Sequence, residues 1–401
     1  MPRSRSALSS CPATRARNNL SPLPAPGPEL SPTLRFSPLI LPALAILVAG
    51  CRSGISKHDH HWFGMDTDFS AILYTGSSTR GGESGAKPLV PEQEAFTRLE
   101  HESARLEKEF SDYLPGSSLR ALQGRVGDTL SLGPELAEVF RAAAEMTQAS
   151  RGSFDITLHD LKTVWGLSSG DTPRVPADTE IAAAMRGNPA FRAPPDSDPS
   201  LHPPFIVLAD GRLALLRDSA VFDLGGIAKG YAVDRMHALL DSLGYPDHLL
   251  QAGGDMRLGG SKGAEPWGVG IRHPREKEGL AGAMRLPAAM AVSTSGDYER
   301  YFIRDGMRYH HVFNPRNGRP ARPYCSVSVL AANSLLADRL TKPLFILGPT
   351  AGAELLKRFG AKAVWMRENG TDTAGAAQPV CYTASSGLDG ILEMNLVPPC
   401  P

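Results

Sequence analysis

The sequence has no excess of either charge. Its 401 residues include 42 Lys and Arg side chains and 42 Asp and Glu side chains, so the formal net charge at pH 7 is zero. A protein whose main task is to bind nucleic acid usually carries a basic excess on one face. The charge balance therefore argues against nucleic acid as a partner.

Cysteine is also scarce, with five residues in the whole chain. No CxxC pair and no Cys/His spacing typical of a metal site is present. Cys11 and Cys51 fall in the first 51 residues, which leaves Cys325, Cys381 and Cys400. An odd count in an exported protein leaves at least one thiol unpaired. Cys381 and Cys400 can pair and tie down the C-terminus, and Cys325 is then expected in the core.

Long hydrophobic runs are missing too. The stretch FSPLILPALAILVAGC (Phe36–Cys51) has the length of a signal-peptide core and is too short to span a bilayer comfortably. It ends in Ala49-Gly50-Cys51, which resembles a bacterial lipobox, where the cysteine is lipidated. The alternatives are an ordinary signal peptide or a buried apolar run. We expect an exported protein with lipidation at Cys51, anchored to a bacterial cell membrane and facing the periplasm or the extracytoplasmic side.

These features predict the domain organisation. Residues 1–50 would be a leader, in which 1–33 are too long for an ordinary signal and would be absent if translation started near Leu34. Residues 51–61 would be a linker, and 62–401 one domain. Eight of the 34 prolines lie in 173–204. We therefore expect residues 171–204 to form an insertion or a long surface loop.

Within 62–401 the apolar periodicity changes irregularly between helix and strand, without an internal repeat or a regular βαβ unit. This predicts a single compact α+β domain rather than a doubly wound sheet. The predicted helices cover 92–113, 134–149, 178–186, 231–240 and 334–347. The predicted strands cover 62–74, a pair around the turn at Asp210-Gly211, 249–260, 267–271, 289–296, 325–332 and 361–366.

The segment VFDLGGIAKGYAVD (Val221–Asp234) joins a predicted strand to a predicted helix. Glycines let the backbone approach an anion, and a helix N-terminus offers free N–H groups to a phosphate. Lys229 would add a full positive charge. The segment is neither a Walker A motif, because Tyr231 follows Gly230, nor a GxGxxG motif. A structural turn with a solvated surface lysine remains an equal alternative.

Three further segments combine glycine with polar side chains. They are AGGDMRLGG (252–260), AVSTSGDYERYF (291–302) and HHVFNPRNGRP (310–320). Each alone can be an ordinary polar loop. Four such segments in one domain point to a site for a large polar ligand that carries phosphates.

Taken together, these segments resemble the FAD:protein FMN transferase (ApbE) family. The resemblance runs in order from about Met65 to Gly348. It rests on 65–67, 154–157 with 165–166, the intact DLGGIAKGYAVD at 223–234, 253–255, 267–274, 293–300, 311–320 and 337–348. A series of ordered motifs is far more specific than any one of them. The resemblance implies the family's α+β fold, with mixed sheets and helices.

The resemblance also implies a reaction. FAD would bind with Mg²⁺ on its pyrophosphate, and a threonine or serine hydroxyl of an exported acceptor protein would attack the phosphorus next to riboflavin. AMP would leave, and FMN would stay on the acceptor through a phosphoester bond. The acceptor could be a subunit of a membrane redox complex. A metal would neutralise charge on the pyrophosphate, and a histidine would take the hydroxyl proton.

Site residues follow from the matching positions. His311 is the candidate base, with a structural histidine that braces the turn as the alternative, and His310 beside it is expected to be incidental. The candidate FAD-binding residues are Met65, Asp155, Asp223, Gly225, Gly226, Lys229, Gly253, Gly254, Asp255, Thr294, Ser295 and Gly296. Asp297 is a further flavin contact, and a turn bonded to itself is the alternative for 294–297. Asp255 and Arg300 can equally form a structural ion pair.

The implied magnesium site contains the main departure. Its ligands would be a backbone carbonyl near Ala228, the carboxylate of Asp338 and a threonine four residues later, on the same helix face. Lys342 stands at this last position. Thr341 could serve instead, or Lys342 could place its ammonium at the metal position or pair with Asp338. Any of these would weaken or move the metal.

Other departures lie nearby. Pro343 predicts a kink or a shorter helix, and Asp66 stands where the family has glycine. Three functions are therefore considered. The first is an active, exported transferase, and the second is an FAD-binding lipoprotein of the same fold that is inactive or slowly hydrolyses FAD. An exported binding module without flavin is a third.

Overall fold

The computed structural model describes residues 55–76, 88–123, 125, 129–168, 170–194, 205–216, 221–260, 262, 265–286, 289–369 and 379–401. The predicted leader, the lipidation site at Cys51 and residues 195–204 of the predicted insertion lie outside these ranges. Within them, no helix is both long enough and apolar enough to cross a membrane.

The fold begins with a hairpin of β1 (Ser56–Gly64) and β2 (Thr67–Thr75). The prediction of one strand over 62–74 was wrong. The chain reverses at Met65 and Asp66, whose φ angles of 48° and 58° are left-handed. Such turns are usually signalled by glycine or asparagine, and the sequence places methionine first. The departure at Asp66 therefore lies at the tip of a tight turn.

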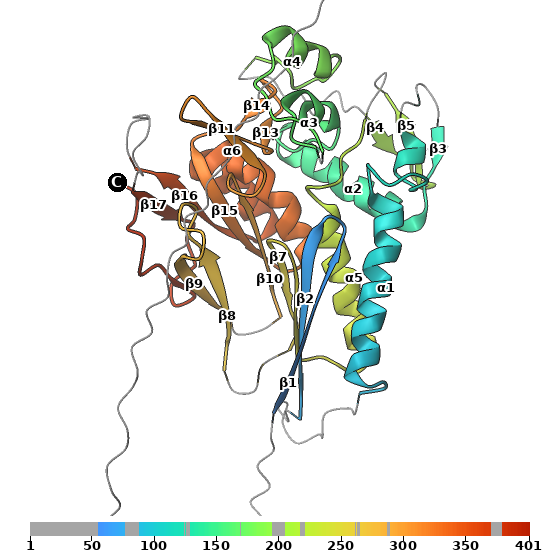
Figure 1. The fold of residues 1–401 in the computed structure, drawn as a ribbon, viewed down its shortest axis with the longest axis vertical. Helices are drawn as coiled ribbons and strands as arrows, with labels where there is room; N and C mark the ends of the chain where they lie inside the picture. The colour runs from blue at the N-terminus through green and yellow to red at the C-terminus, as the bar shows by residue number, and fades with distance from the viewer. Residues whose placement is uncertain are drawn as a thin grey trace, which may run out of the picture. The chain divides into compact units, whose positions relative to one another are not determined.

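A central sheet of eight strands carries the fold (Figure 1). Its order is β1-β2-β6-β7-β10-β15-β16-β17, and neighbouring strands run antiparallel. The added strands are β6 (His248–Ala252), β7 (Asp255–Leu258), β10 (Ala291–Gly296), β15 (Tyr324–Ala331), β16 (Lys362–Glu368) and β17 (Val380–Ala384). The single strand expected over 249–260 is a hairpin, because Gly253 with φ 56° reverses the chain.

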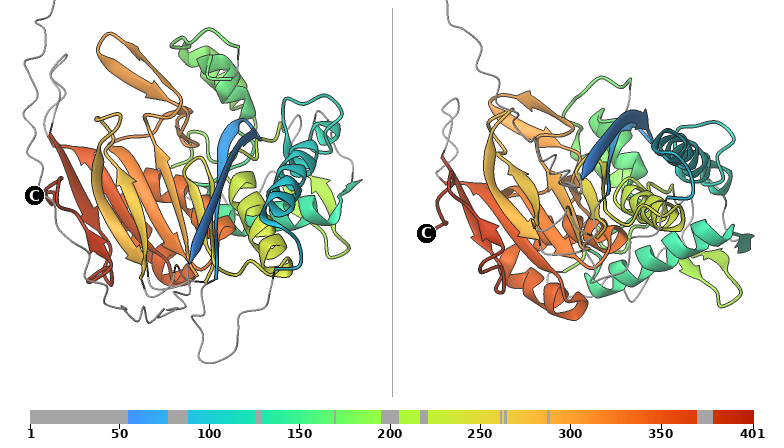
Figure 2. Two further views of the ribbon diagram at one scale, coloured as in Figure 1. Left: turned by 60° about the horizontal axis from the view of Figure 1, so that its bottom comes forward. Right: turned by 90° about the horizontal axis from the view of Figure 1, so that it is seen from below.

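Four helices bury apolar faces in one core. They are α1 (Glu92–Phe110), α2 (Pro134–Ala149), α5 (Ala228–Ser242) and α6 (Ser334–Phe359). Figure 2 shows them gathered on one side of the strands. Three of them contact the central sheet directly, and α2 contacts α6 instead. The main hydrophobic core lies between the two layers and includes Phe69, Leu99, Phe140, Tyr231 and Phe345, each almost fully buried.

The helix predictions were close, with one error in α6. The bounds of α2 match the prediction, and α5 starts three residues earlier than expected, at Ala228. Pro343 lies inside a continuing helix and does not end it. The backbone departs from helical geometry at Gly348 (φ 70°, ψ −175°), just before Pro349. The kink therefore lies one and a half turns beyond the expected place.

The other face of the sheet is covered by a small sheet of β8 (Trp267–Arg272), β9 (Leu280–Leu286) and β18 (Leu392–Glu393). A second core, which includes Trp267, Met284 and Met366, fills the space between the two sheets. The expected disulfide between Cys381 and Cys400 is confirmed, and Cys325 is free and buried as predicted.

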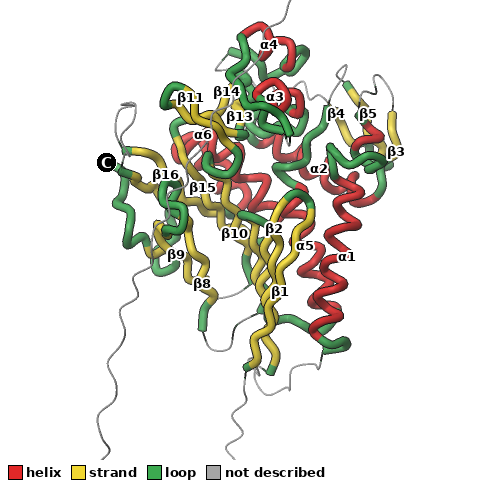
Figure 3. The backbone as a smooth tube through the Cα atoms, in the orientation of Figure 1, coloured by secondary structure: helices red, strands yellow, loops and turns green. Residues whose placement is uncertain are grey.

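A lobe rises at one end of the sheet (Figures 1 and 3). It contains α3 (His159–Trp165), α4 (Asp178–Ala184), the hairpin of β11 (Tyr301–Arg304) and β12 (Met307–His310), and the pair β13 (Phe313–Asn314) and β14 (Arg319–Pro320). A third core around Trp165, Ile181 and Phe313 holds the lobe together. The short elements η1 (Arg120–Leu122), β3 (Thr129–Ser131), β4 (Phe205–Val207) and β5 (Arg212–Leu215) complete the described chain. The single α+β domain is confirmed, since residues 51–401 form one compact unit.

Candidate functional site

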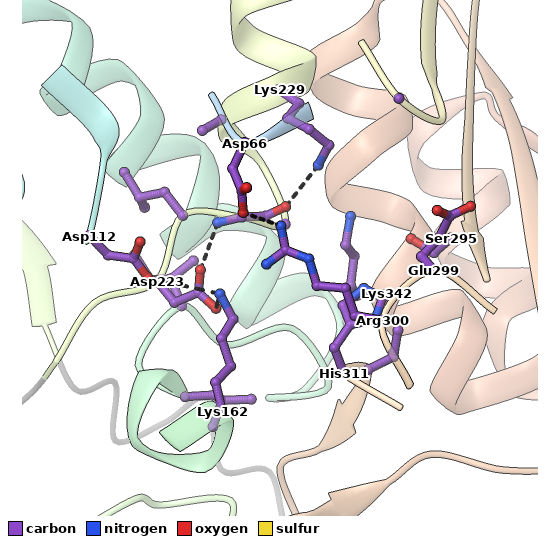
Figure 4. Close-up of a pocket in the computed structure, with 18 of the residues that line it drawn as sticks. Asp66, Asp112, Lys162, Asp223, Lys229, Ser295, Glu299, Arg300, His311 and Lys342 are labelled. Atoms are coloured by element: carbon purple, nitrogen blue, oxygen red, sulfur yellow. Dashed lines mark hydrogen bonds and ion pairs between the residues drawn. The ribbon is translucent and has the colours of Figure 1, made fainter. Parts of the chain in front are cut away.

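A cavity of about 450 Å³ opens between the lobe and the end of the central sheet (Figure 4). The β1–β2 turn, the start of α5, the β6–β7 turn, the end of β10 and the turn after β12 all contribute to its walls. Most of the predicted site residues line it: Met65, Asp155, Asp223, Gly225, Gly226, Ala228, Lys229, Gly253, Gly254, Asp255, Thr294, Ser295, Gly296, His311 and Lys342. Asp338 and Thr341 lie behind this wall.

The glycine-rich turn before α5 is held by Asp223. One carboxylate oxygen accepts the Gly225 N–H at 2.8 Å, and the other lies 2.6 Å from the Lys162 ammonium. Burial alone would raise the pKa of Asp223, but the Lys162 charge and these hydrogen bonds lower it to about 2. Asp223 is therefore ionised and fixes the turn.

The lysine of this turn is not solvated, contrary to the alternative reading. Because α5 begins at Ala228, Lys229 lies in its first turn and reaches back to the carbonyl of Gly225 at 2.9 Å. Its ammonium is also 3.3 Å from Asp255. Burial opposes the charged form, but the carboxylates of Asp338 and Asp255 raise the pKa of Lys229 above its usual range. Lys229 is a fixed cation in the cavity wall.

Asp255 and Arg300 do not pair with each other, so that expectation was wrong. Asp255 accepts the Ser293 hydroxyl and pairs with Lys229. Arg300 instead forms an ion pair with Asp66 at the tip of the β1–β2 turn (Figure 4). This second pair crosses the cavity wall and holds the left-handed turn in place.

Lys342 pairs with Asp338, which is the last of the three arrangements considered from the sequence. The two residues lie one turn apart on α6, and the Lys342 ammonium contacts Asp338 Oδ1. Asp338 Oδ2 accepts the Gly230 N–H at 3.1 Å. Asp338 is fully buried, yet the charges of Lys342 and Lys229 lower its pKa. Both of its oxygens are thus engaged by the protein.

These residues do not fit a magnesium ion at the implied position. Mg²⁺ needs near-octahedral oxygen ligands, and a protonated lysine offers no acceptor. Thr341 does not replace the lost ligand, since its hydroxyl donates to the Asp338 carbonyl at 2.7 Å and accepts from Ser295 at 2.8 Å. Its side chain is fully buried and lies outside the cavity wall.

Residues 294–297, at the end of β10 and just after it, divide between the cavity wall and a structural ion pair. Thr294 and Ser295 line the cavity, although each already has a side-chain partner, Ser328 for Thr294 and Thr341 for Ser295. Asp297 was predicted to contact flavin and does not line the cavity. Arg275 holds both of its oxygens at 2.8 Å, so Asp297 belongs to a structural ion pair.

The two adjacent histidines differ as expected. His310 is buried and both ring nitrogens contact the backbone, Nε2 at 2.9 Å from the Ala321 carbonyl and Nδ1 at 3.3 Å from the Val312 N–H. His311 lines the cavity, and its buried Nδ1 has no hydrogen-bond partner in the described chain. Burial, together with the neighbouring His310 ring and the charges of Lys162, Lys342 and Arg300, lowers the pKa of His311 to about 3. The ring is neutral near pH 7 and can accept a proton.

The sequence analysis missed Lys162 and Asp112. Lys162 lies in α3 between the two parts of a quoted motif, 154–157 and 165–166, and contacts Asp223. Asp112 follows α1, lies 3.9 Å from Lys162 and accepts a hydrogen bond from His159 at 3.0 Å. A cation between the two motif halves was a usable signal. Nothing in the local sequence marked Asp112.

Two buried neutral histidines should make the fold sensitive to acid. Burial lowers the pKa of His248 to about 3 and that of His310 to about 4. Unfolding returns both to about 6.5, so their contribution to stability is full above that pH and falls as the pH drops toward the folded values. We expect chemical denaturation to show a loss on the order of 1 kcal/mol per histidine between about pH 6.5 and 5.5.

A variant separates this effect from general acid denaturation. His248→Gln should show a shallower pH dependence of the unfolding free energy over this range, whatever its absolute stability. An equal slope in the variant and the wild type would contradict the assignment.

Fold and site together define an α+β protein with a polar cavity, walled by a glycine turn, paired lysines and the histidine His311. The chain belongs to the ApbE family, whose sequence model matches residues 65–365.

The chain is also similar in sequence to named members of this family. An FAD:protein FMN transferase of Rhodobacter capsulatus is 30% identical over 300 residues, which cover 74% of this chain and 55% of that protein. The chain thus spans about half the length of that relative. An FAD:protein FMN transferase of Vibrio cholerae is 29% identical over 317 residues, covering 78% of this chain and 88% of the relative.

The fold is also similar to solved structures of ApbE proteins. The ApbE protein of Thermotoga maritima superimposes with a TM-score of 0.65 at 26% identity, over 77% of this chain and 94% of that one. The flavinyl transferase ApbE of Pseudomonas stutzeri, in its apo form, gives a TM-score of 0.66 at 26% identity, over 84% and 97%.

Proposed function

We propose that the chain is an FAD:protein FMN transferase. The observation that carries the proposal is one cavity wall that joins a glycine-rich turn and two fixed ammonium groups to a neutral histidine without a partner at Nδ1. The first group of features suits a pyrophosphate, and the second suits the removal of a proton from a hydroxyl. The family and the names of the relatives support the same reaction.

Each residue has a task in this reaction. The turn around Gly225 and Gly226 brings the backbone close to the FAD pyrophosphate, and Lys229 adds positive charge there. The acceptor oxygen bonds to the phosphorus on the riboflavin side, and the bond from that phosphorus to the bridging oxygen breaks, so AMP leaves with that oxygen. The His311 imidazole takes the hydroxyl proton. No group in the described chain bonds His311 Nδ1, so no protein hydrogen bond there fixes the tautomer of the ring.

The acceptor and the location belong to the same proposal. The acceptor is an exported protein that carries a threonine (or serine), such as a subunit of a membrane redox complex. The enzyme is attached to the membrane through a lipid on Cys51 and faces the extracytoplasmic side. The apolar stretch that ends at Ala49-Gly50-Cys51 supports this part.

One observation favours a second function. The Lys342–Asp338 pair occupies the carboxylate that the family resemblance assigns to a metal. A chain that had lost the metal and gained nothing in its place would be an FAD-binding lipoprotein that is inactive in transfer or hydrolyses FAD slowly.

The test is to incubate the purified full chain with FAD, with and without an exported acceptor that carries the threonine, and to follow AMP and protein-bound flavin fluorescence. We expect AMP and acceptor-bound flavin in equal amounts. Bound FAD with neither product would favour the flavin-binding lipoprotein. AMP without acceptor-bound flavin would identify a pyrophosphatase.

A further inference from the structure

Lys342 is built into the cavity wall. Its side chain is 21% exposed, and its stem packs on the glycine-rich turn, where a Cβ on Gly226 would lie 3.2 Å from Lys342 Cε. Its ammonium contacts Asp338, and Figure 4 shows it beside the cavity with His311 and Arg300 nearby. A side chain seated in this way is not a solvated surface lysine.

Lys342 is also part of a balanced cluster of four charges. Lys342 pairs with Asp338, and Lys229 pairs with Asp255. The carboxylates are saturated, because Asp338 also accepts the Gly230 N–H and Asp255 also accepts the Ser293 hydroxyl. Both carboxylates are almost fully buried, at 0% and 2% exposure, whereas the lysine side chains keep 21% and 24%. Asp338 thus lies behind the cavity wall, and the two ammonium groups are the most exposed charges of the cluster.

This arrangement disfavours a divalent cation in the same place. The ion would have to displace an ammonium from Asp338 and then remain beside two positive charges, which is electrostatically unfavourable. A lysine, in contrast, is a common phosphate ligand that acts as a point charge and needs no fixed coordination geometry.

We propose that the Lys342 ammonium takes the place of the divalent cation, so that this chain binds the FAD pyrophosphate and releases AMP without a metal. This inference rests on the proposed function and names the group that stabilises its leaving phosphate. As the bond between the riboflavin-side phosphorus and the bridging oxygen breaks, the negative charge on the AMP oxygen develops beside Lys342 and Lys229. The acceptor oxygen forms the new bond, and its proton goes to His311.

The experiment compares the wild type with Lys342→Met, Lys342→Thr and, as a matched control on the same helix, the exposed Lys357→Met. FAD affinity is measured by flavin fluorescence in EDTA and in Mg²⁺, and transfer to the acceptor is measured in both. The wild type should bind FAD and transfer FMN equally in the two conditions. Lys342→Met should bind FAD about ten- to a hundredfold more weakly in both, the loss of a charged hydrogen bond.

Lys342→Thr gives the sharpest readout. It removes the ammonium and restores an oxygen four residues after Asp338, so its FAD affinity should fall in EDTA and recover in Mg²⁺. Mn²⁺ titration should detect one more site in this variant than in the wild type. Lys357→Met should behave as the wild type.

The possible outcomes separate this inference from the proposed function. Wild-type transfer that needs Mg²⁺ would overturn the role of Lys342 and leave the transferase intact. Metal-independent FAD binding without transfer in either condition would uphold Lys342 as the pyrophosphate ligand and reject the transferase. No FAD binding in either condition would reject both. If the variants fail to fold, the wild-type comparison in EDTA and Mg²⁺ decides the question by itself.

Discussion

Replacing His311 with alanine should lower the rate of FMN transfer about 10²- to 10⁴-fold, the usual effect of losing a positioned general base. The physical reason is the state of the ring. Burial and the surrounding positive charges lower the pKa of His311 to about 3, so the imidazole is neutral near pH 7. Its Nδ1 has no hydrogen-bond partner in the described chain.

The measurement is the rate of acceptor-bound flavin at saturating FAD, together with FAD affinity and thermal stability. FAD affinity should change by less than about threefold, because a base acts on the hydroxyl rather than on the bound pyrophosphate. His101→Ala, which replaces an exposed histidine of α1, is the matched control and should match the wild type. A His311 variant that transfers FMN normally, or one that loses only stability, would support the structural alternative.

Much of the fold could be predicted from local patterns in the sequence. The bounds of α2 could be predicted because Pro134 suits the first turn of a helix and the apolar residues repeat with helical spacing. The hairpins β1–β2 and β6–β7 were each expected as one strand. In both, the reversal is a two-residue turn inside a run with strand-like alternation, and the run looks continuous until the pairing partner is known.

The candidate site was predicted in composition but not in its contacts. Glycine and polar segments far apart in the chain line one cavity. This could be predicted because the order of the segments matched a family pattern. The family pattern did not predict which charged side chains pair with each other. Lys162 meets Asp223 across 61 positions, and Arg275 rather than flavin meets Asp297, since such pairs depend on how α3 and the sheet ends pack.

Lys342 shows most clearly what sequence spacing alone cannot predict. The sequence placed it one helical turn after Asp338 and left three arrangements open. The choice among them depended on two non-local facts, the absence of a side chain at Gly226, which leaves room for the lysine stem, and the Gly230 N–H that occupies the second oxygen of Asp338. A spacing rule alone could not supply either.

Trp165 should have the largest effect on stability, because it joins the lobe to the loop that follows His311. It is fully buried, and its indole N–H donates to the Gly318 carbonyl at 3.0 Å. Its ring stacks on Tyr309 at 5.5 Å and lies 6.1 Å from Phe313. Trp165→Ala would leave a large cavity and an unpaired carbonyl, and should lower the free energy of unfolding by about 3–5 kcal/mol in urea titrations.

The milder pair Trp165→Phe and Trp267→Phe tests whether this tryptophan also positions the site. Trp267 is a buried tryptophan of the second core, and its indole N–H bonds to the Gly259 carbonyl at 3.1 Å, so both variants lose a similar hydrogen bond, about 1 kcal/mol. Trp165 lies one turn after Lys162 on α3 and packs near the loop that carries His311. Trp165→Phe should therefore weaken FAD binding and slow transfer at temperatures where it is folded, whereas Trp267→Phe should not. Equal FAD affinity in the two variants would restrict Trp165 to stability and would mean that the lobe keeps Lys162 and His311 in place without it.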